Sequence, residues 1–322
     1  MKGLSKTAGR FAGVRMIGVV TNPRAGKNIG NRARINRLKE ILGPHGFLRE
    51  AQTFDEMLDI AEECRRERIK ALAIHGGDGT LHHTLSAFIP VYSGTGLPPV
   101  ALLRGGTMNT IARCLGIKGL SETILKRLVG TAGRKGLFDV VRANTLKVND
   151  RYGFIFGLGF PVNLLKAYYT GGGRGRSKTI RVLLEILFSM IQKGPAYNDF
   201  FHPFEAKIWV QGERLPGRSY TAFLGATVKE VGLGFKPTRR TAQGEGVFQC
   251  LCMGPQRMGL NALRVLLGME LMGEKPMDRL ASRSVIMLER PSDMQIDGEI
   301  FKDQEEIRLS AGPTIRFMRP KP

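Results

Sequence analysis

The sequence predicts two domains: an α/β domain with a parallel sheet, followed by a mainly antiparallel β domain. Up to about residue 143, short apolar runs alternate with segments of helical periodicity. Glycine-rich turns follow three of those apolar runs, as expected where buried strands lead into helices. Beyond residue 143 the chain becomes a series of strand-like segments joined by turns. Alternation in the first part favours a parallel sheet with helices on its faces.

The first domain is expected to contain three buried strands and four helices. The strands cover Met16–Thr21, Lys70–Ile74 and Pro99–Leu103, and the helices cover Arg32–Leu42, Phe54–Arg66, Leu81–Phe88 and Thr107–Leu115. The first helix, for example, has apolar residues at Ile35, Leu38, Ile41 and Leu42, which is a helical spacing.

In the second domain we expect strands with two helices among them. The strand segments are RYGFIFGLGF, EAKIWVQGERL, SYTAFLGATV, GVFQCLCMG, SVIMLER and DMQIDGEIF. The helices are expected over Thr179–Lys193 and Arg257–Met272. We place the domains at residues 1–143 and 144–311, with a last strand at about 312–322 that returns to the first domain.

The chain has 322 residues, a net charge of +21 and a pI of about 10.3. That charge favours an anionic partner: nucleic acid, an anionic membrane surface or a polyphosphate substrate. Composition alone does not choose among them. No RNA-binding module and no interleaving of aromatic and basic residues is present, so we expect no nucleic acid partner.

The sequence indicates a cytoplasmic protein. No apolar stretch fits a secretory signal or spans a bilayer, so we expect a soluble or peripheral protein. The start, Met1–Arg15, lacks a developed amphipathic helix, which argues against a transit peptide. The four cysteines match no zinc site and no disulfide framework, which agrees with a reducing compartment.

The turn GGDGT at residues 76–80 carries the chemistry of the first domain. In an open α/β sheet, ligands bind beyond the carboxyl ends of the strands. Glycines let a ligand approach closely, and the exposed N–H groups at a helix start favour phosphate. Asp78 would repel phosphate unless a cation or a transferable proton were involved, which suggests metal-dependent phosphoryl transfer. The alternative is a tight turn with an aspartate cap.

A second turn, GGTMN at residues 105–109, follows the next strand and offers neutral hydrogen-bonding groups. Thr107 is also a plausible N-cap. Together with the loop NPRAG at residues 22–26, the two turns would line one nucleotide from three sides. A Walker A motif and a GxGxxG motif are both absent, so a P-loop or dinucleotide fold is not indicated.

These motifs, with DGE at 297–299, resemble the diacylglycerol kinase catalytic-domain family, which includes bacterial lipid kinases and sphingosine kinases. They occur in the family's order over nearly the whole chain. The resemblance implies an α/β nucleotide domain and a C-terminal β-sandwich with the active site between them. It also implies ATP, Mg²⁺ and transfer of the γ-phosphate to a lipid hydroxyl.

By the same resemblance, residues of the three turns would hold ATP. They are Asn22, Pro23, Gly26, Gly76, Gly77, Gly79, Thr80, Gly106, Thr107 and Asn109. Asp78, Asp139 and Glu299 would be the catalytic carboxylates, with Asp78 also at the metal. Asp78 or Glu299 would accept the proton of the lipid hydroxyl. From the residues alone, Asp139 could equally be a strand-end aspartate, and the DG at 297–298 a hairpin turn.

Two departures from the family pattern stand out. The family has an aspartate directly after the asparagine of the second turn, where this chain has Thr110. That aspartate is thought to join a metal and water network, so its loss would weaken activity or move the ligand elsewhere. Bacterial members often carry an acidic pair for a structural metal in the second domain. Here only Glu245 is near, and we predict no such site.

Membrane contact is expected from the segment GGGRGRSKTIRVLLEILFSMIQK at residues 171–193. Basic residues lead into an amphipathic helical pattern there, which suits the anionic inner face of a membrane. An ordinary core-covering helix behind a solvated loop would give the same pattern.

Other functions stay open. An NAD kinase shares the GGDG turn but normally has an Asn-Glu dipeptide, which this sequence lacks. A non-catalytic lipid- or nucleotide-binding protein with the kinase fold is favoured by Thr110 and opposed by Asp78, Asp139 and Glu299. Diacylglycerol, a sphingoid base, ceramide and a polyprenol all remain candidate acceptors, and the sequence does not indicate the oligomeric state.

Overall fold

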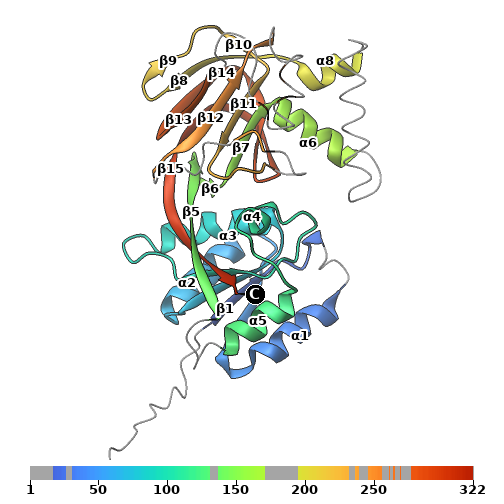
Figure 1. The fold of residues 1–322 in the computed structure, drawn as a ribbon, viewed down its shortest axis with the longest axis vertical. Coiled ribbons are helices and arrows are strands. Elements are labelled where there is room, and N and C mark those ends of the chain that lie inside the picture. The colour runs from blue at the N-terminus through green and yellow to red at the C-terminus, as the bar shows by residue number, and fades with distance from the viewer. Residues whose placement is uncertain are drawn as a thin grey trace, which may run out of the picture.

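The computed structural model describes residues 17–26, 31–130, 137–170, 195–231, 236–238, 246–255, 261, 264, 269 and 277–321. Its first part, which we call the α/β region, alternates strands and helices (Figure 1). The strands are β1 (Ile17–Thr21), β2 (Gly46–Glu50), β3 (Ala71–His75) and β4 (Val100–Leu102). The helices are α1 (Arg32–Leu42), α2 (Phe54–Arg66), α3 (Asp78–Val91), α4 (Thr110–Cys114) and α5 (Ser121–Gly130), with a 3-10 turn at Gly43–His45.

Local sequence accounts for these elements. Every residue of β1 and β3 is buried, so both strands are nearly continuous apolar runs, as parallel strands covered on two faces must be. The side chain of Thr53 accepts a hydrogen bond from the backbone of Glu56, whose own side chain bonds back to the Thr53 backbone. This capping box fixes the start of α2.

The parallel strands lie in the order β2-β1-β3-β4. The chain therefore crosses from one side of β1 to the other between β2 and β3, and the strand order reverses between β1 and β3. In doubly wound sheets, ligands bind at the carboxyl ends of the strands at such a point. Those ends are followed here by the loop from Asn22 and the turn from Gly76.

The second part, which we call the β region, is mainly antiparallel, as predicted. Its strands are β6 (Arg151–Gly153), β7 (Ile155–Gly159), β8 (Phe204–Val210), β9 (Glu213–Arg214), β10 (Ser219–Tyr220), β11 (Ala222–Ala226), β12 (Phe248–Met253), β13 (Met277–Ala281) and β14 (Arg283–Ile296). Helices α6 (Phe160–Thr170) and α8 (Pro195–Phe201) lie beside them (Figure 1).

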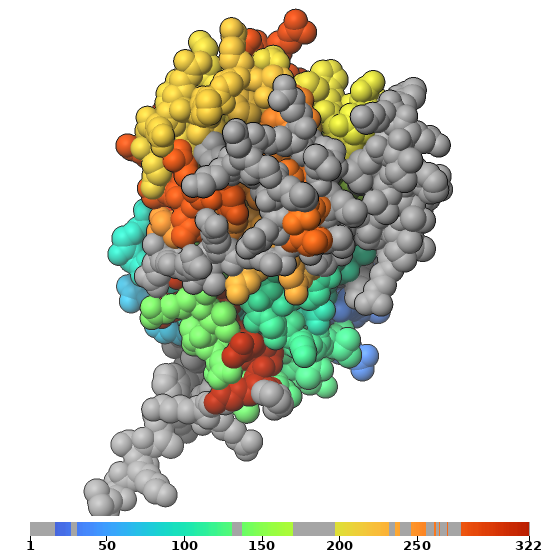
Figure 2. Space-filling model, turned by 45° about the horizontal axis from the view of Figure 1, so that its top comes forward, coloured from blue at the N-terminus to red at the C-terminus, as the bar shows by residue number. Residues whose placement is uncertain are grey.

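Two long strands, β5 (Phe138–Val148) and β15 (Glu299–Pro320), run antiparallel to each other from one region into the other (Figure 1). Figure 2 shows the red end of β15 beside green β5 on the α/β region. Near that end, Phe317 pairs with Val100 of β4 in parallel. Because both strands pass through both regions, the division at residue 143 remains our proposal.

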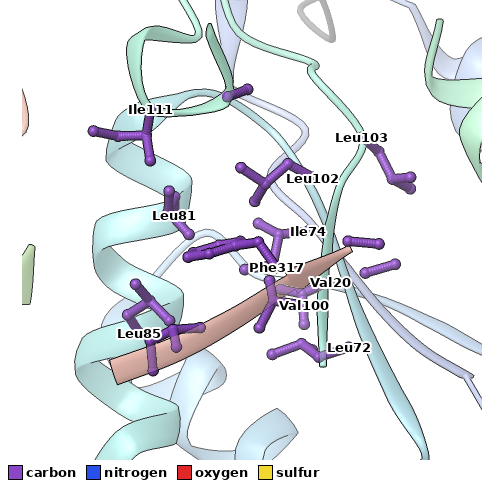
Figure 3. Packing of buried hydrophobic residues seen from close by; sticks show 14 of the residues in the cluster. Val20, Leu72, Ile74, Leu81, Leu85, Val100, Leu102, Leu103, Ile111 and Phe317 are labelled. Carbon is purple, nitrogen blue, oxygen red and sulfur yellow. The ribbon is translucent and has the colours of Figure 1, made fainter. Parts of the chain in front are cut away.

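The ring of Phe317 is fully buried in the core of the α/β region. Figure 3 shows it between the sheet side chains Ile74 and Val100 and the α3 side chains Leu81 and Leu85. A separate apolar cluster, which includes Phe156, Phe223 and Phe248, forms the core of the β region. The end of the chain thus supplies an aromatic side chain to the core made by its beginning.

The structure corrects several predicted elements. Strand β2 and helices α5, α6 and α8 were not predicted, and α6 begins inside the segment RYGFIFGLGF at its last residue. EAKIWVQGERL forms the hairpin of β8 and β9, and SYTAFLGATV divides into β10 and β11. The predicted helices over 179–193 and 257–272 lie outside the described residues, apart from three positions in the second.

None of the helices in the described ranges is long and apolar enough to cross a membrane. The four cysteines are free thiols, three of them buried.

Candidate active site

The loop after β1 lies against the second glycine turn. The side-chain Oδ1 of Asn22 accepts a hydrogen bond from the backbone N–H of Arg24 at 2.8 Å, which folds the loop back. A Cβ on Gly26 would lie 2.9 Å from Oγ1 of Thr107, so the two segments touch. Asn22, Pro23 and Gly26 are therefore neighbours of the turn that carries Thr107.

The turns after β3 and β4 pack backbone against backbone. The N–H of Gly106 donates to the carbonyl of Gly76 at 2.9 Å. A Cβ on Gly106 would overlap the Cα of Gly77, so no larger residue fits without moving a turn. Behind this contact, Thr80 is buried against Gly76. The structure therefore brings together the three turns that the sequence predicted as one site.

Asp78, the first residue of α3, caps a different helix. Its Oδ2 accepts from the N–H of Thr110 at 2.8 Å and its Oδ1 from the N–H of Ile111 at 3.1 Å. Burial raises the pKa of this carboxyl, and the hydrogen bonds from the backbone and side chain of Thr110 and from Ile111 oppose the rise. The aspartate cap expected as the alternative is thus real, but it serves α4 rather than α3.

Helix α4 begins later than predicted, at Thr110 rather than Thr107. Its N-cap is Asn109, in a left-handed conformation with φ of 47°. The Asn109 side chain is buried and faces its own turn, since Nδ2 donates to the Gly106 carbonyl at 2.7 Å and Oδ1 accepts from the Gly106 N–H. Asn109 shapes the turn, whereas Thr107 is exposed beside it.

The DG pair forms the two-residue hairpin turn expected from sequence, with Ile296 opposite Glu299 and positive φ at both turn residues. The Asp297 carboxylate is buried and accepts from the N–H groups of Phe154 and Ile155 at 2.8–3.1 Å. Burial raises the pKa of Asp297 to about 8, and the charges of Asp78 and Glu299 add to the rise. Sequence reasoning did not assign Asp297 a role.

Glu299 is the first residue of β15, and its side chain packs against the first turn of α3. A Cβ on Gly79 would overlap its Oε1, so the missing side chain of Gly79 makes room for the carboxylate. Carboxylates from α3 and from the β14–β15 turn therefore meet at the border of the two regions.

The structure places Asp139 apart from this group. It lies on β5 opposite Arg319, whose Nη2 donates to Oδ2 at 3.1 Å, and Nζ of Lys321 lies 3.8 Å from Oδ1. Arg319 is twenty residues beyond Glu299 along β15. These ion pairs fit the alternative that the sequence allowed for Asp139, an aspartate at the end of a strand.

A largely apolar cavity opens beside these carboxylates. Its walls come from α6, β7, β11, β12 and the start of α4, and Asp78, Gln295 and Asp297 stand at its polar end. The apolar lining is Met108, Ile111, Ile155, Phe160, Pro161, Leu164, Leu165, Ala222, Leu224, Val231, Pro237, Leu251 and Met253, with Tyr168. Sequence reasoning named none of these residues, because they come from many separate elements.

A smaller hollow lies among the glycine turns. Gly76, Gly77 and Asn109 line it, and so does Arg104, which has a positive φ of 44°. The rest of its lining is Asp78 and the apolar side chains of Ile74, Leu81, Leu102 and Ala112. Nε of Arg104 is buried with no hydrogen-bond partner in the described part of the chain. Of the residues described around the two spaces, Asp78 alone lines both.

The described residues contain no cluster of three or more His, Cys, Asp or Glu side chains that could hold a metal ion by themselves. Mg²⁺ usually keeps several waters and takes one or two carboxylates plus substrate phosphates. Asp78 and Glu299, next to the glycine turns, fit that shared donor set. Glu245 and the basic segment 171–193 lie outside the described residues.

Comparison with known proteins identifies a family that the α/β region resembles. Residues 16–142 match the family model of the diacylglycerol kinase catalytic domain. This match confirms the resemblance inferred from the motifs. No curated protein matches the chain in sequence.

Solved structures extend the likeness beyond the matched segment. A crystal structure of a diacylglycerol kinase from Bacillus anthracis strain Sterne superposes with a TM-score of 0.63 at 16% identity, covering 94% of this chain and 96% of that one. Two structures of a candidate diacylglycerol kinase from the same strain give TM-scores of 0.66 and 0.65 at the same identity and coverage. At this identity the likeness establishes the fold of both regions.

Proposed function

We propose that the protein is an ATP-dependent lipid kinase that transfers the γ-phosphate to the hydroxyl of a membrane lipid. One observation carries the proposal: Asp78 lines both the hollow among the glycine turns and the apolar cavity. A carboxylate between the glycine turns and the cavity can take a proton from a hydroxyl in the cavity while the amides of the turns hold phosphate.

The nucleotide half of the proposal rests on the glycine turns. Backbone N–H groups at the carboxyl ends of parallel strands favour phosphate. The Arg104 side chain adds a cation to the same hollow. We propose that the loop Asn22–Gly26 and the turns of Gly76–Thr80 and Gly106–Asn109 hold ATP, with Asn109 and Thr80 shaping the turns.

The acceptor half rests on the apolar cavity. Aliphatic and aromatic side chains suit an acyl or isoprenoid chain, and the polar end suits a hydroxyl group. A lipid lying along this cavity would bring its hydroxyl to Asp78 and Asp297. Diacylglycerol and a sphingoid base are the acceptors we propose to test first.

In the proposed step, the lipid hydroxyl attacks the γ-phosphorus in line, its proton passes to an oxygen of Asp78, and ADP leaves. The two hydrogen bonds from α4 fix the Asp78 carboxylate in place. Its raised pKa makes it a stronger base than an exposed aspartate. Asp297, with a pKa of about 8, is largely protonated near neutral pH and suits a hydrogen-bond donor.

Asp78 and Glu299 would be the residues that hold Mg²⁺, which would supply positive charge to the transferring phosphoryl group. We also propose that the protein acts on the inner face of the membrane, held by its positive charge. The 171–193 segment stays the candidate for that contact.

A second candidate, a non-catalytic lipid- or nucleotide-binding protein, is favoured by two observations. Both oxygens of Asp78 already accept N–H groups, and Thr110 stands where the family carries aspartate. Such a protein would bind the nucleotide without turning it over.

The deciding experiment incubates the purified protein with labelled ATP, Mg²⁺ and mixed micelles of each candidate lipid. The matched variant is Asp78→Asn, with Asp199→Asn as the exposed control. We expect a phosphorylated lipid from the unchanged protein and the control, and a loss of at least about a hundredfold in Asp78→Asn.

ATP binding measured by calorimetry on the same samples separates the two candidates. Binding without product on any lipid would overturn the kinase and favour the binding protein. Thr110→Asp would then be the variant to test for restored turnover.

A further inference from the structure

A further hollow, with cationic side chains around an apolar floor of Ile69, Leu97, Pro98 and Pro99, lies at the other end of the parallel sheet from the glycine turns. It is bounded by the end of α2, the turn after α3, and the residues that precede β3 and β4. Lys70 lies at its edge, immediately before β3, whereas Gly76 follows the same strand. Five strand residues span roughly 16 Å, so the hollow is separate from the candidate active site.

The hollow is strongly cationic. Arg65, Arg68, Lys70 and Arg316 line it, all four are exposed, and no carboxylate is among the described residues that line it. Arg65 donates to the Val91 carbonyl at 2.7 Å, and Arg316 donates to a backbone carbonyl at 3.3 Å. Backbone contacts thus hold two of the guanidinium groups in place without neutralising them.

Arg68 and Lys70 have no ion pair in the described part of the chain. Neighbouring features offset part of the charge. Glu62 lines an adjoining hollow with Arg65 and Arg68. Helices α2 and α3 both end here, and each C-terminus contributes roughly half a negative charge. The four cationic side chains outweigh Glu62 and the two helix C-termini, so the net charge at the hollow is positive.

One residue of the hollow, Tyr92, has a hydroxyl group without a hydrogen-bond partner in the described part of the chain. The Tyr92 side chain lines the hollow and is only 7% exposed, with its ring stacked on Phe88. Its hydroxyl is buried and has no hydrogen-bond partner among the described residues. Ring packing explains why the aromatic side chain is buried, but it leaves the hydroxyl unexplained, since buried hydroxyls are normally bonded.

We propose that this hollow binds a phosphate group, with the Tyr92 hydroxyl donating to a phosphate oxygen and Arg68 and Lys70 supplying charge. Arginine and lysine side chains are the usual phosphate partners in proteins, and a neutral donor beside them fits the same anion. The phosphate could come from a free anion or from the headgroup of an anionic phospholipid. The site stands independently of the kinase activity proposed above.

The test follows the backbone amide NMR signals of Lys70, Thr95 and Gly96 during titration with inorganic phosphate. Tyr92→Phe removes the hydroxyl and keeps the ring, and Arg68→Gln with Lys70→Gln removes two charges. The control, Arg37→Gln with Lys118→Gln, removes two charges from exposed residues elsewhere. All proteins are also sedimented with phosphatidylglycerol vesicles and with phosphatidylcholine vesicles.

We expect saturable shifts at the three amides in the unchanged protein and the control. Binding should be several-fold weaker in Tyr92→Phe and at least tenfold weaker in the double variant. If the double variant also loses phosphatidylglycerol binding, the ligand is a headgroup; if it does not, the ligand is a free phosphate. Shifts confined to residues 76–79, or equal affinities in all four proteins, would overturn the site.

Discussion

The glycine turns that the α/β region brings to the site form a polar wall of backbone groups and small polar side chains, whereas the wall that the β region gives to the cavity consists mainly of aliphatic and aromatic side chains. Each wall nevertheless holds one aspartate whose oxygens accept two successive backbone N–H groups. Asp78 takes those of Thr110 and Ile111, and Asp297 takes those of Phe154 and Ile155.

Under the proposed function, this contrast assigns phosphate recognition and lipid recognition to different parts of the polypeptide. Backbone amides would serve the first, and side-chain shape would serve the second. Substitutions on one wall should therefore change one kind of binding and leave the other intact. Only the aspartates at the junction should affect both.

The largest effect is expected for Gly106→Ala on the polar wall. The new methyl group would overlap the Cα of Gly77, so both turns must shift. We expect nucleotide binding to fall at least tenfold and the free energy of unfolding to fall by about 1–3 kcal/mol. Calorimetry and chemical denaturation measure the two effects. Gly130→Ala, whose added Cβ would meet nothing within 4 Å, is the matched control.

Arg104→Gln tests whether side-chain charge adds to the backbone amides of the polar wall. A charge-assisted hydrogen bond contributes about 1.5–3 kcal/mol, so losing one should weaken nucleotide binding about tenfold to a hundredfold. Lipid binding should not change. Arg37→Gln, which removes an exposed arginine on α1, provides the control, and equal nucleotide affinities in the two variants would exclude Arg104 from the phosphate site.

Leu164→Trp tests the apolar wall. Leu164 lines the cavity from α6, and an indole there would occupy space meant for a lipid chain. We expect the KM for the lipid to rise about tenfold while ATP affinity stays unchanged, because one lost chain contact costs about 1–3 kcal/mol. Leu120→Trp, at an exposed leucine, should leave both constants as they are. A change in ATP affinity alone would contradict the division between the walls.

A separate prediction concerns the pH dependence of stability at Asp297. Its pKa in the folded protein, about 8, is above the ordinary value of 3.8, so the folded state keeps a proton that the unfolded chain releases between these values. The contribution is fully present below about pH 4 and is lost as the pH rises to about 8.

Asparagine cannot release this proton. Asp297→Asn should therefore show a shallower loss of unfolding free energy between about pH 4 and pH 8, measured by denaturation at several pH values. The same slope in the unchanged protein and the variant would show that Asp297 is ionised throughout. Asp199→Asn, at an exposed position, controls for the change of residue type.

Helices and strands of the α/β region that are determined by residues close together in the sequence were predictable. Strands β1 and β3 lie within one residue of the expected ranges, because each is a short apolar run that ends at a glycine or proline turn. Strand β2 was missed because GFLRE carries only two apolar residues and no alternation. Helix α6 was missed at a point where an apolar strand passes directly into an apolar helix.

The sequence predicted only those parts of the site that lie within one continuous segment. The three turns were identified from their glycines, but the overlap of Gly79 with Glu299 joins residues 220 positions apart. Nothing local indicates that Asp297 is buried or that Asp78 caps α4. Such contacts arise from packing, which the spacing of residues in a sequence does not encode.

The position of Phe317 affects how the protein is made. A ribosome completes residues 16–142 long before it reaches residue 317, yet the core of that segment includes the Phe317 ring. The α/β region of a nascent chain therefore lacks part of its interior until residue 317 has been translated. Its folding is completed only after that point, and removing the segment that carries Phe317 would damage the part of the protein that was synthesised before it.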